Sequence, residues 1–318
     1  MRKLIFFLIW LFFADDMSGQ EVCDDAAIMS KTGSWKQHSD ANMQGGKDMT
    51  AVNHCLDRIS QLFQSAYPDL KGMEATWHRG MSDPLFAGAP TAYEYISEYK
   101  AWYCNVHVHQ LMLSGETGTW AYVFVNSLVW FFQDEREPLK LNGSVLYMLP
   151  VKKGSWKGYD LYQPYFHREA SCIVLTRGGR IPWKPVTQEQ YLGVCRAFLE
   201  GQKKQFPNLS WLDQKIQTID NYLHASSVAS LQQPAVVLPR DKYDFKGGFS
   251  TEDKGGCQMV VLNPTYFSLS GSAPQLMVLY WRWEKNVAAQ YFKKQLEEHF
   301  PVDKLQGMID GLSGGIKK

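Results

Sequence analysis

The sequence predicts an α+β fold in which mainly antiparallel sheet is flanked by a few amphipathic helices. One apolar stripe at helical spacing follows Thr50 and ends before Pro68. From Met73 to about Trp183 the apolar period changes to two, with β-branched and aromatic residues at the alternating positions. These strand-like runs lack the regular alternation with helices that a parallel sheet needs, so an antiparallel sheet is favoured.

The first predicted helix covers residues 50–66. It follows a polar, glycine-containing segment, residues 21–48, that we expect to be an extended arm. Pro68 ends the helix, because the residue before a proline disfavours helical backbone. Cys55 lies on the apolar stripe of the helix, which favours a core position. The stripe consists of Val52, Cys55, Leu56, Ile59, Leu62, Phe63 and Ala66.

Strands are predicted over residues 103–113 and 119–132. The segment between them, Ser114-Gly115-Glu116-Thr117-Gly118, is typical of a hairpin loop. Gly178-Gly179 is typical of a two-residue turn that leads into Trp183. Further strands are predicted over residues 144–149, 171–176, 235–238, 257–262 and 275–283.

Two helices are predicted between the strand runs. Thr187 and Gln190 form the T-x-x-Q pattern of a capping box at the start of the first, and Pro207 ends it. The second begins at Ser210. A last helix covers residues 287–299 and stops before a proline.

The order of these elements fits two lobes divided near Pro185. Residues 21–185 would hold the first helix and an antiparallel sheet, and residues 186–318 would hold the later helices and strands. One continuous domain, with helices on one face of a single sheet, fits the same order. The sequence leaves both alternatives open.

Residues 1–20 have the three-part layout of a secretory signal peptide. Arg2 and Lys3 precede an unbroken apolar run from Leu4 to Ala14, and a polar stretch follows. Eleven apolar residues are too few to span a bilayer, which takes about 20. We therefore expect cleavage after Gln20, export to the periplasm or the medium, and no membrane span after cleavage.

Charge and cysteine content narrow the possible partners. The chain carries 33 basic and 32 acidic residues, a net charge of +1, so it has no electrostatic footprint for nucleic acid. Its six cysteines are widely spaced, without a C-x-x-C pair. In an oxidising compartment they are expected to form one to three bridges or to remain buried thiols.

Motifs with an assigned chemistry are missing from the sequence. It contains no G-x-S-x-G, no H-E-x-x-H, no phosphate-binding P-loop and no dinucleotide fingerprint. Catalytic groups can still come together from distant segments, so an enzyme is not excluded. No cofactor is predicted.

His107 and His109 are the first candidate site. On a strand, two residues at i and i+2 project from the same face and could share a metal if a third ligand came from a neighbouring strand. The sequence offers no such third ligand, so no metal site is predicted. Val106 and Val108 would occupy the opposite, inward face, which leaves the histidines on a solvated face of the sheet.

A basic segment beside a helix start is the second candidate site. Arg177 and Arg180, with Lys184, lie near Trp183 and just before the helix that starts after Thr187. Cations near a helix N-terminus suit an anionic group. The structural alternative is that the glycines form a turn, the prolines stiffen the connection and Thr187 caps the helix.

Three patches of sequence carry a resemblance. They are TRGGRIPWKPVTQEQYL over residues 176–192, GETGTW over residues 115–120 and NPTYF over residues 263–267, which Pro274-Gln275 follows. The chain resembles exported bacterial proteins that have no assigned activity. The resemblance implies a secreted or periplasmic protein, and it implies no catalytic residue, cofactor or substrate.

The sequence therefore favours an exported cell-envelope protein that binds rather than catalyses. Its partner would be an envelope protein, a glycan or a small ligand, and spread tryptophans could provide stacking surfaces for sugars. The alternative is an exported hydrolase whose site combines dispersed histidine and acidic residues, with His107 and His109 as the place to look. A structural role in the envelope, through a sheet face, is the third possibility.

Overall fold

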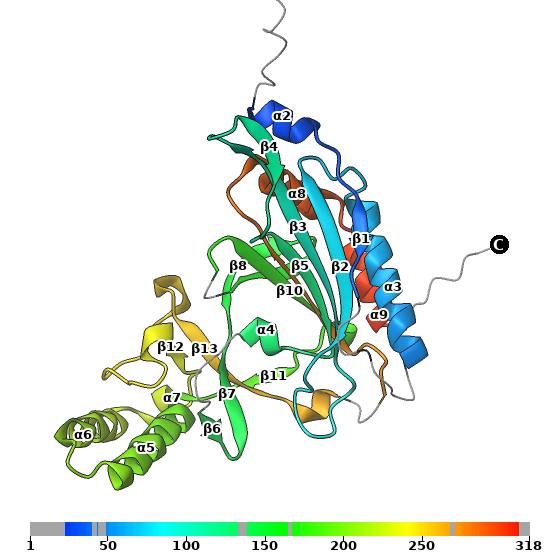
Figure 1. The fold of residues 1–318 in the computed structure, drawn as a ribbon. Helices are drawn as coiled ribbons and strands as arrows, with labels where there is room; N and C mark the ends of the chain where they lie inside the picture. Colours follow the sequence, from blue (N-terminus) through cyan, green and yellow to red (C-terminus); the bar gives the residue numbers. More distant parts are fainter. Residues whose placement is uncertain are drawn as a thin grey trace, which may run out of the picture.

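The computed structural model describes residues 23–39, 43, 49–132, 139–164, 167–267 and 271–311, and it confirms the α+β class with mainly antiparallel sheets (Figure 1). The expected signal peptide, residues 1–20, lies outside the described residues. Among the described helices, none combines the length and the apolar character that crossing a membrane would take.

The larger sheet has nine strands in the order β1-β2-β3-β5-β14-β10-β9-β8, and β4 pairs with the outer part of β3. All neighbours are antiparallel except β1 and β2, which are parallel. The strands are β1 Trp35–Gln37, β2 Met73–Met81, β3 Tyr93–Asn105, β4 Gln110–Leu113, β5 Trp120–Val125, β8 Val151–Trp156, β9 Tyr159–Gln163, β10 Ala170–Thr176 and β14 Leu276–Arg282.

Three helices cover one face of this sheet: α3 Met49–Ala66, α8 Val287–His299 and α9 Val302–Ile309 (Figure 1). The alternating tyrosines of β3 explain the packing, because Tyr95 and Tyr99 face the helices. Tyr95 stacks on Phe63 of α3 with ring centroids 5.1 Å apart, and Tyr99 contacts Phe292 of α8 at 4.1 Å. The expected core position of Cys55 is confirmed.

The smaller sheet has the strand order β11-β13-β7-β6, with β12 paired to β13. Its strands are β6 Lys140–Leu141, β7 Ser144–Met148, β11 Trp183–Pro185, β12 Val236–Val237 and β13 Cys257–Leu262. Its outer face packs against α5 Gln188–Gln205, α6 Ser210–Ala225 and α7 Val228–Leu231. A second core lies there, centred on Leu146, Tyr191, Leu199, Leu212 and Met259.

The inner faces of the two sheets meet in a third core. The short helix α4, Val129–Phe132, lies between them (Figure 1). Phe124 and Tyr280 come from the larger sheet, and Val260 comes from the smaller one. The described chain is therefore layered as helices, sheet, aromatic core, sheet and helices.

Both sheets take strands from both sides of Pro185. β6 and β7 precede it and belong to the smaller sheet, whereas β14 follows it and lies in the middle of the larger one. β14 pairs with β5 over six residues and with β10 over seven. A division of the chain near Pro185 would therefore split both sheets and would not separate one sheet from the other.

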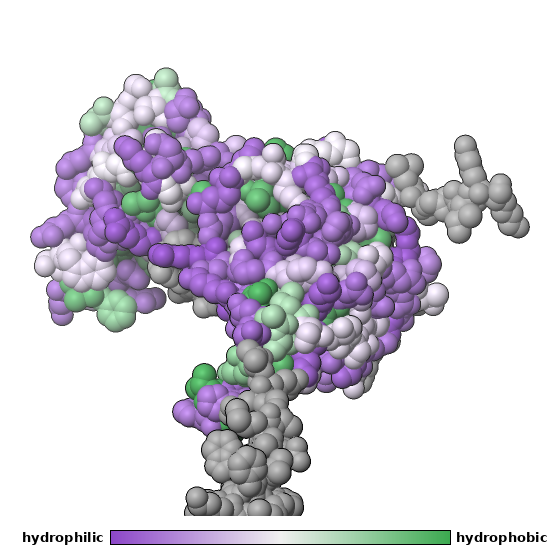
Figure 2. Space-filling view, turned by 90° about the horizontal axis from the view of Figure 1, so that it is seen from above, coloured by the Kyte–Doolittle hydropathy of each residue, from purple (hydrophilic) through white to green (hydrophobic). Residues whose placement is uncertain are grey.

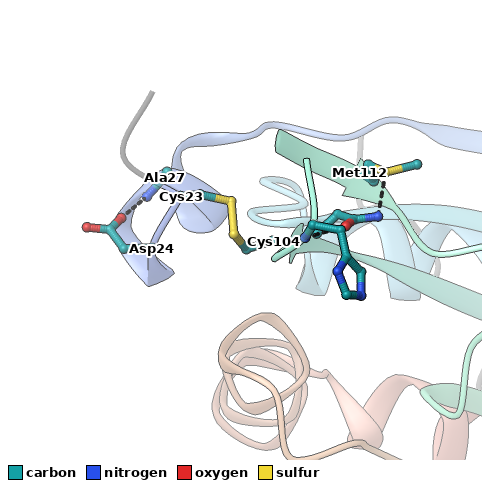
Figure 3. The surroundings of a disulfide bond; sticks show 7 residues. Cys23, Asp24, Ala27, Cys104 and Met112 are labelled. Atoms are coloured by element: carbon teal, nitrogen blue, oxygen red, sulfur yellow. Dashed lines mark hydrogen bonds between the residues drawn. A yellow bond between two sulfur atoms is a disulfide. The ribbon is translucent and has the colours of Figure 1, made fainter. Parts of the chain in front are cut away.

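The segment that follows residue 22 is folded, contrary to the expected extended arm. It contains helix α2, Asp25–Ser30, and strand β1. Cys23 is joined to Cys104 of β3 by a disulfide, and Asp24 caps α2 by accepting a hydrogen bond from the Ala27 N–H (Figure 3). The other four cysteines are buried thiols: Cys55, Cys172, Cys195 and Cys257.

Polar side chains dominate the face drawn in Figure 2, where apolar residues gather only in small, separate groups. That face therefore offers no broad apolar surface of the kind that marks an interface. A cleft between the two sheets tells more about function than this polar face does.

Candidate functional site

A cleft of about 440 Å³ opens where the aromatic core between the two sheets ends. The larger sheet contributes residues of β9 and β10, and the smaller sheet contributes β11, β13 and the segment leading into β11. Gln306 of α9 closes one side. This size lies within the usual range of ligand clefts, about 300–1,000 Å³.

The turn after β10 brings two predicted residues to this cleft. Gly178 and Gly179 have φ values of 59° and 68°, in the left-handed region that glycine adopts without strain. The expected turn is there, but it joins two sheets instead of closing a hairpin. β10 belongs to the larger sheet and β11 to the smaller, so Arg180 and Trp183 lie on the crossing and line the cleft.

Arg180 is held in a defined position. Its guanidinium lies over the ring of Tyr266, 5.0 Å from the centroid. The Tyr266 hydroxyl donates a 2.6 Å hydrogen bond to the Gln275 carbonyl, which fixes the ring. Within the described part of the chain Arg180 forms no ion pair, so its charge is available to a ligand.

Trp183 is half-buried and belongs to the cleft and the core at once. Its ring stacks on Phe131 with centroids 5.4 Å apart and meets Phe132 edge-on at 6.1 Å. The remaining exposed part lines the cleft. Because the ring is packed from behind, it offers a rigid apolar wall.

Arg177 does not line the cleft, and its side chain donates hydrogen bonds to two backbone carbonyls instead. Its Nε donates to the Ile309 carbonyl at 3.3 Å, and its Nη2 donates to the Pro274 carbonyl at 3.2 Å. It therefore ties the end of β10 to the end of α9. The adjacent helix start is closed by its own capping box, because Thr187 and Gln190 bond each other's backbone N–H groups.

His107 and His109 are not on a strand, which corrects the expectation. β3 ends at Asn105, whose Oδ1 accepts a hydrogen bond from the His107 N–H and so closes a turn. Both histidines are exposed at the tip of the β3–β4 hairpin. Val106 and Val108 are exposed too, by 68% and 53%, so the expected inward face does not exist.

The predicted hairpin loop at residues 114–118 has a different role as well. It connects β4 to β5, and both strands pair with β3, one with each half. The true hairpin turn is residues 106–109. The long β3 strand therefore pairs with β5 along its first part and with β4 along its last part.

A smaller compartment of about 180 Å³ adjoins the cleft. The two share Leu149, Asp160, Tyr162 and Gln258, and the smaller one adds Lys152 and Glu252. Asp160 forms a 2.7 Å ion pair with Lys152. Burial, aided by the charge of Asp160, raises the pKa of the Tyr162 hydroxyl, which therefore stays protonated as a donor.

The buried thiols and Lys242 do not line either compartment of the cleft. Burial raises the pKa of Cys55, Cys195 and Cys257 to about 11, which keeps these thiols unreactive. Burial lowers the pKa of Lys242 to about 8, but this residue does not line the cleft. The described residues bring together no group of three metal-ligating side chains.

Comparison with known proteins returned no match to any protein family, curated protein or solved structure. The geometry of the cleft is therefore the basis for assigning a function.

Proposed function

We propose that this protein is exported and acts as a binding protein, holding a small ligand in the cleft between its two sheets. The observation that carries the proposal is the lining of the cleft. The lining combines a rigid apolar wall at Trp183 with two polar side chains, Arg180 and Gln258, that form no ion pair or side-chain hydrogen bond with a described residue. An apolar pocket with a few convergent polar groups is the usual form of a ligand site.

A hydrolase is the less supported alternative. Hydrolysis by dispersed side chains needs a base or nucleophile with a shifted pKa near the reacting atoms. The strongly shifted groups of the described chain are tyrosines, cysteines and a lysine whose shifts come mainly from burial. None of these observations favours hydrolysis over binding.

Filling the cleft tests the binding function. Gln258 lies on the wall shared by both compartments, so Gln258→Trp should occlude them while a strand tolerates the aromatic residue. We would measure melting temperatures with defined tripeptides, disaccharides and dicarboxylic acids. At least one class should stabilise the wild-type protein and not Gln258→Trp, since a ligand of the folded state raises its stability.

Lys184→Trp is the matched control, because Lys184 is exposed on β11 outside the cleft and should keep the ligand response. The proposal fails if none of the three classes stabilises the wild-type protein, or if Gln258→Trp keeps the same response.

Export has its own test. Intact-mass spectrometry of the protein purified from a cell that exports it should find residues 1 to about 20 missing, as the signal-peptide layout predicts. A full-length mass, together with fractionation among the soluble cell contents, would contradict export and leave the binding test unaffected.

A further inference from the structure

We infer that the ligand of the cleft is a short peptide with a free amino end and a free carboxyl end. The inference rests on the proposed binding function and names its ligand class. It comes from three groups that line the two adjoining compartments and that form no ion pair or side-chain hydrogen bond with a described residue: a cation, an amide and a carboxylate.

The cationic end is Arg180. It lines the larger compartment only, and its guanidinium is positioned by the Tyr266 ring. An arginine fork matches the two oxygens of a carboxylate. A peptide carboxyl end would therefore lie beside Arg180.

The anionic end is Glu252. It lines the smaller compartment only, at the start of the short turn Glu252–Lys254, and forms no ion pair within the described residues. Asp160 and Lys152 lie in the same compartment, but they neutralise each other. The net charge of this end is therefore negative, and it suits an ammonium group.

The middle of the cleft presents amide groups. Gln258 lines both compartments, and no described residue forms a hydrogen bond with its side-chain oxygen or nitrogen. Gln306 donates its amide hydrogens to the Thr176 carbonyl and to Asp310, which leaves its Oε1 as an acceptor. A side-chain amide with a donor and an acceptor is complementary to a peptide bond.

Three related probes separate the two ends. Isothermal titration calorimetry would compare trialanine, N-acetyl-trialanine and trialanine amide. The wild-type protein should bind trialanine about two- to fivefold more tightly than either blocked form, as expected for exposed charge pairs. Trialanine amide lacks the carboxylate for Arg180, and N-acetyl-trialanine lacks the ammonium for Glu252.

Two substitutions should then act selectively. Arg180→Gln should abolish the preference for trialanine over its amide and keep the preference over the acetylated form, and Glu252→Gln should do the reverse. Arg240→Gln and Glu116→Gln are matched controls at exposed positions outside the cleft, and both should keep both preferences.

Equal binding of all three probes by the wild-type protein would overturn the peptide assignment, as would an Arg180→Gln variant that weakens all three equally. If none of the peptides binds while a disaccharide or a dicarboxylic acid stabilises the wild-type protein and not Gln258→Trp, the cleft is a ligand site and only the peptide assignment is wrong. If no compound binds, both proposals fail.

Discussion

Replacing Asn126 with alanine should lower the free energy of unfolding by about 5 kcal/mol. Asn126 is fully buried at the end of β5, and its side chain satisfies three backbone groups from distant segments. Its Nδ2 donates to the carbonyls of Thr91 and Ala273, both at 3.1 Å, and its Oδ1 accepts from the Gln275 N–H at 2.8 Å. Alanine leaves the buried Gln275 N–H without a partner, at about 1–3 kcal/mol, and removes two partly buried hydrogen bonds to the carbonyls, at about 1 kcal/mol each.

The backbone adds a further cost. Asn126 has a φ of 56°, in the left-handed region, which asparagine tolerates and alanine does not. Asn126→Gly removes the same hydrogen bonds without this strain, so it should be about 1 kcal/mol more stable than Asn126→Ala. Comparing the two variants therefore separates the hydrogen bonds from the backbone.

Urea unfolding followed by tryptophan fluorescence measures these changes. Asn142→Gly is the control, because Asn142 also has a positive φ of 49° but is exposed in a turn, and it should be nearly neutral. An Asn126→Ala protein without a cooperative transition agrees with the prediction. A loss below about 1 kcal/mol, the value of one ordinary hydrogen bond, would contradict it.

Removing the disulfide should cost about 4 kcal/mol. Cys23 and Cys104 are 81 residues apart in sequence, so their bond removes much conformational freedom from the unfolded chain. It also fastens α2 to the outer part of β3 (Figure 3). The double variant Cys23→Ser/Cys104→Ser should unfold at a lower urea concentration than the wild-type protein.

Reductant provides the control for this prediction. It should lower the urea midpoint of the wild-type protein to that of the double variant and should leave the variant unchanged. Four buried thiols remain in both proteins and cannot account for a difference. If reductant left the urea midpoint of the wild-type protein unchanged, the disulfide would contribute no stability.

Local patterns in the sequence predict much of the fold. The helix expected over residues 287–299 is α8, and the capping box at Thr187 is present with both of its hydrogen bonds. The strands expected near residues 144–149 and 257–262 are β7 and β13. Helical spacing, capping and short β-branched runs are local signals, so no tertiary information is needed to interpret them.

The sequence predicts turns less well than helices and strands, although one turn contains a residue pair that is typical of hairpins. Asn142-Gly143 joins β6 to β7, and Lys157-Gly158 joins β8 to β9, with positive φ at all four residues. An Asn-Gly pair is a strong indicator of a two-residue hairpin, whereas a Lys-Gly pair is not. The β8–β9 hairpin remained unpredicted because β8 is a largely polar strand at the edge of the sheet and its turn pair, Lys-Gly, carries little signal.

The sequence predicts only some of the residues that line the candidate site. Arg180 and Trp183 belong to one short basic segment, so a local motif could identify them. Asp160, Glu252 and Gln258 come from β9, a short turn and β13, and they meet because the two sheets exchange strands across the chain. Strand order is a tertiary property that residue spacing does not specify.

A crystal structure of the protein grown with trialanine tests the central claim most directly. The account predicts the peptide in the cleft between the two sheets, with its carboxylate at Arg180 and its ammonium at Glu252. Density for trialanine only outside this cleft, at a peptide concentration that saturates binding in solution, would contradict it.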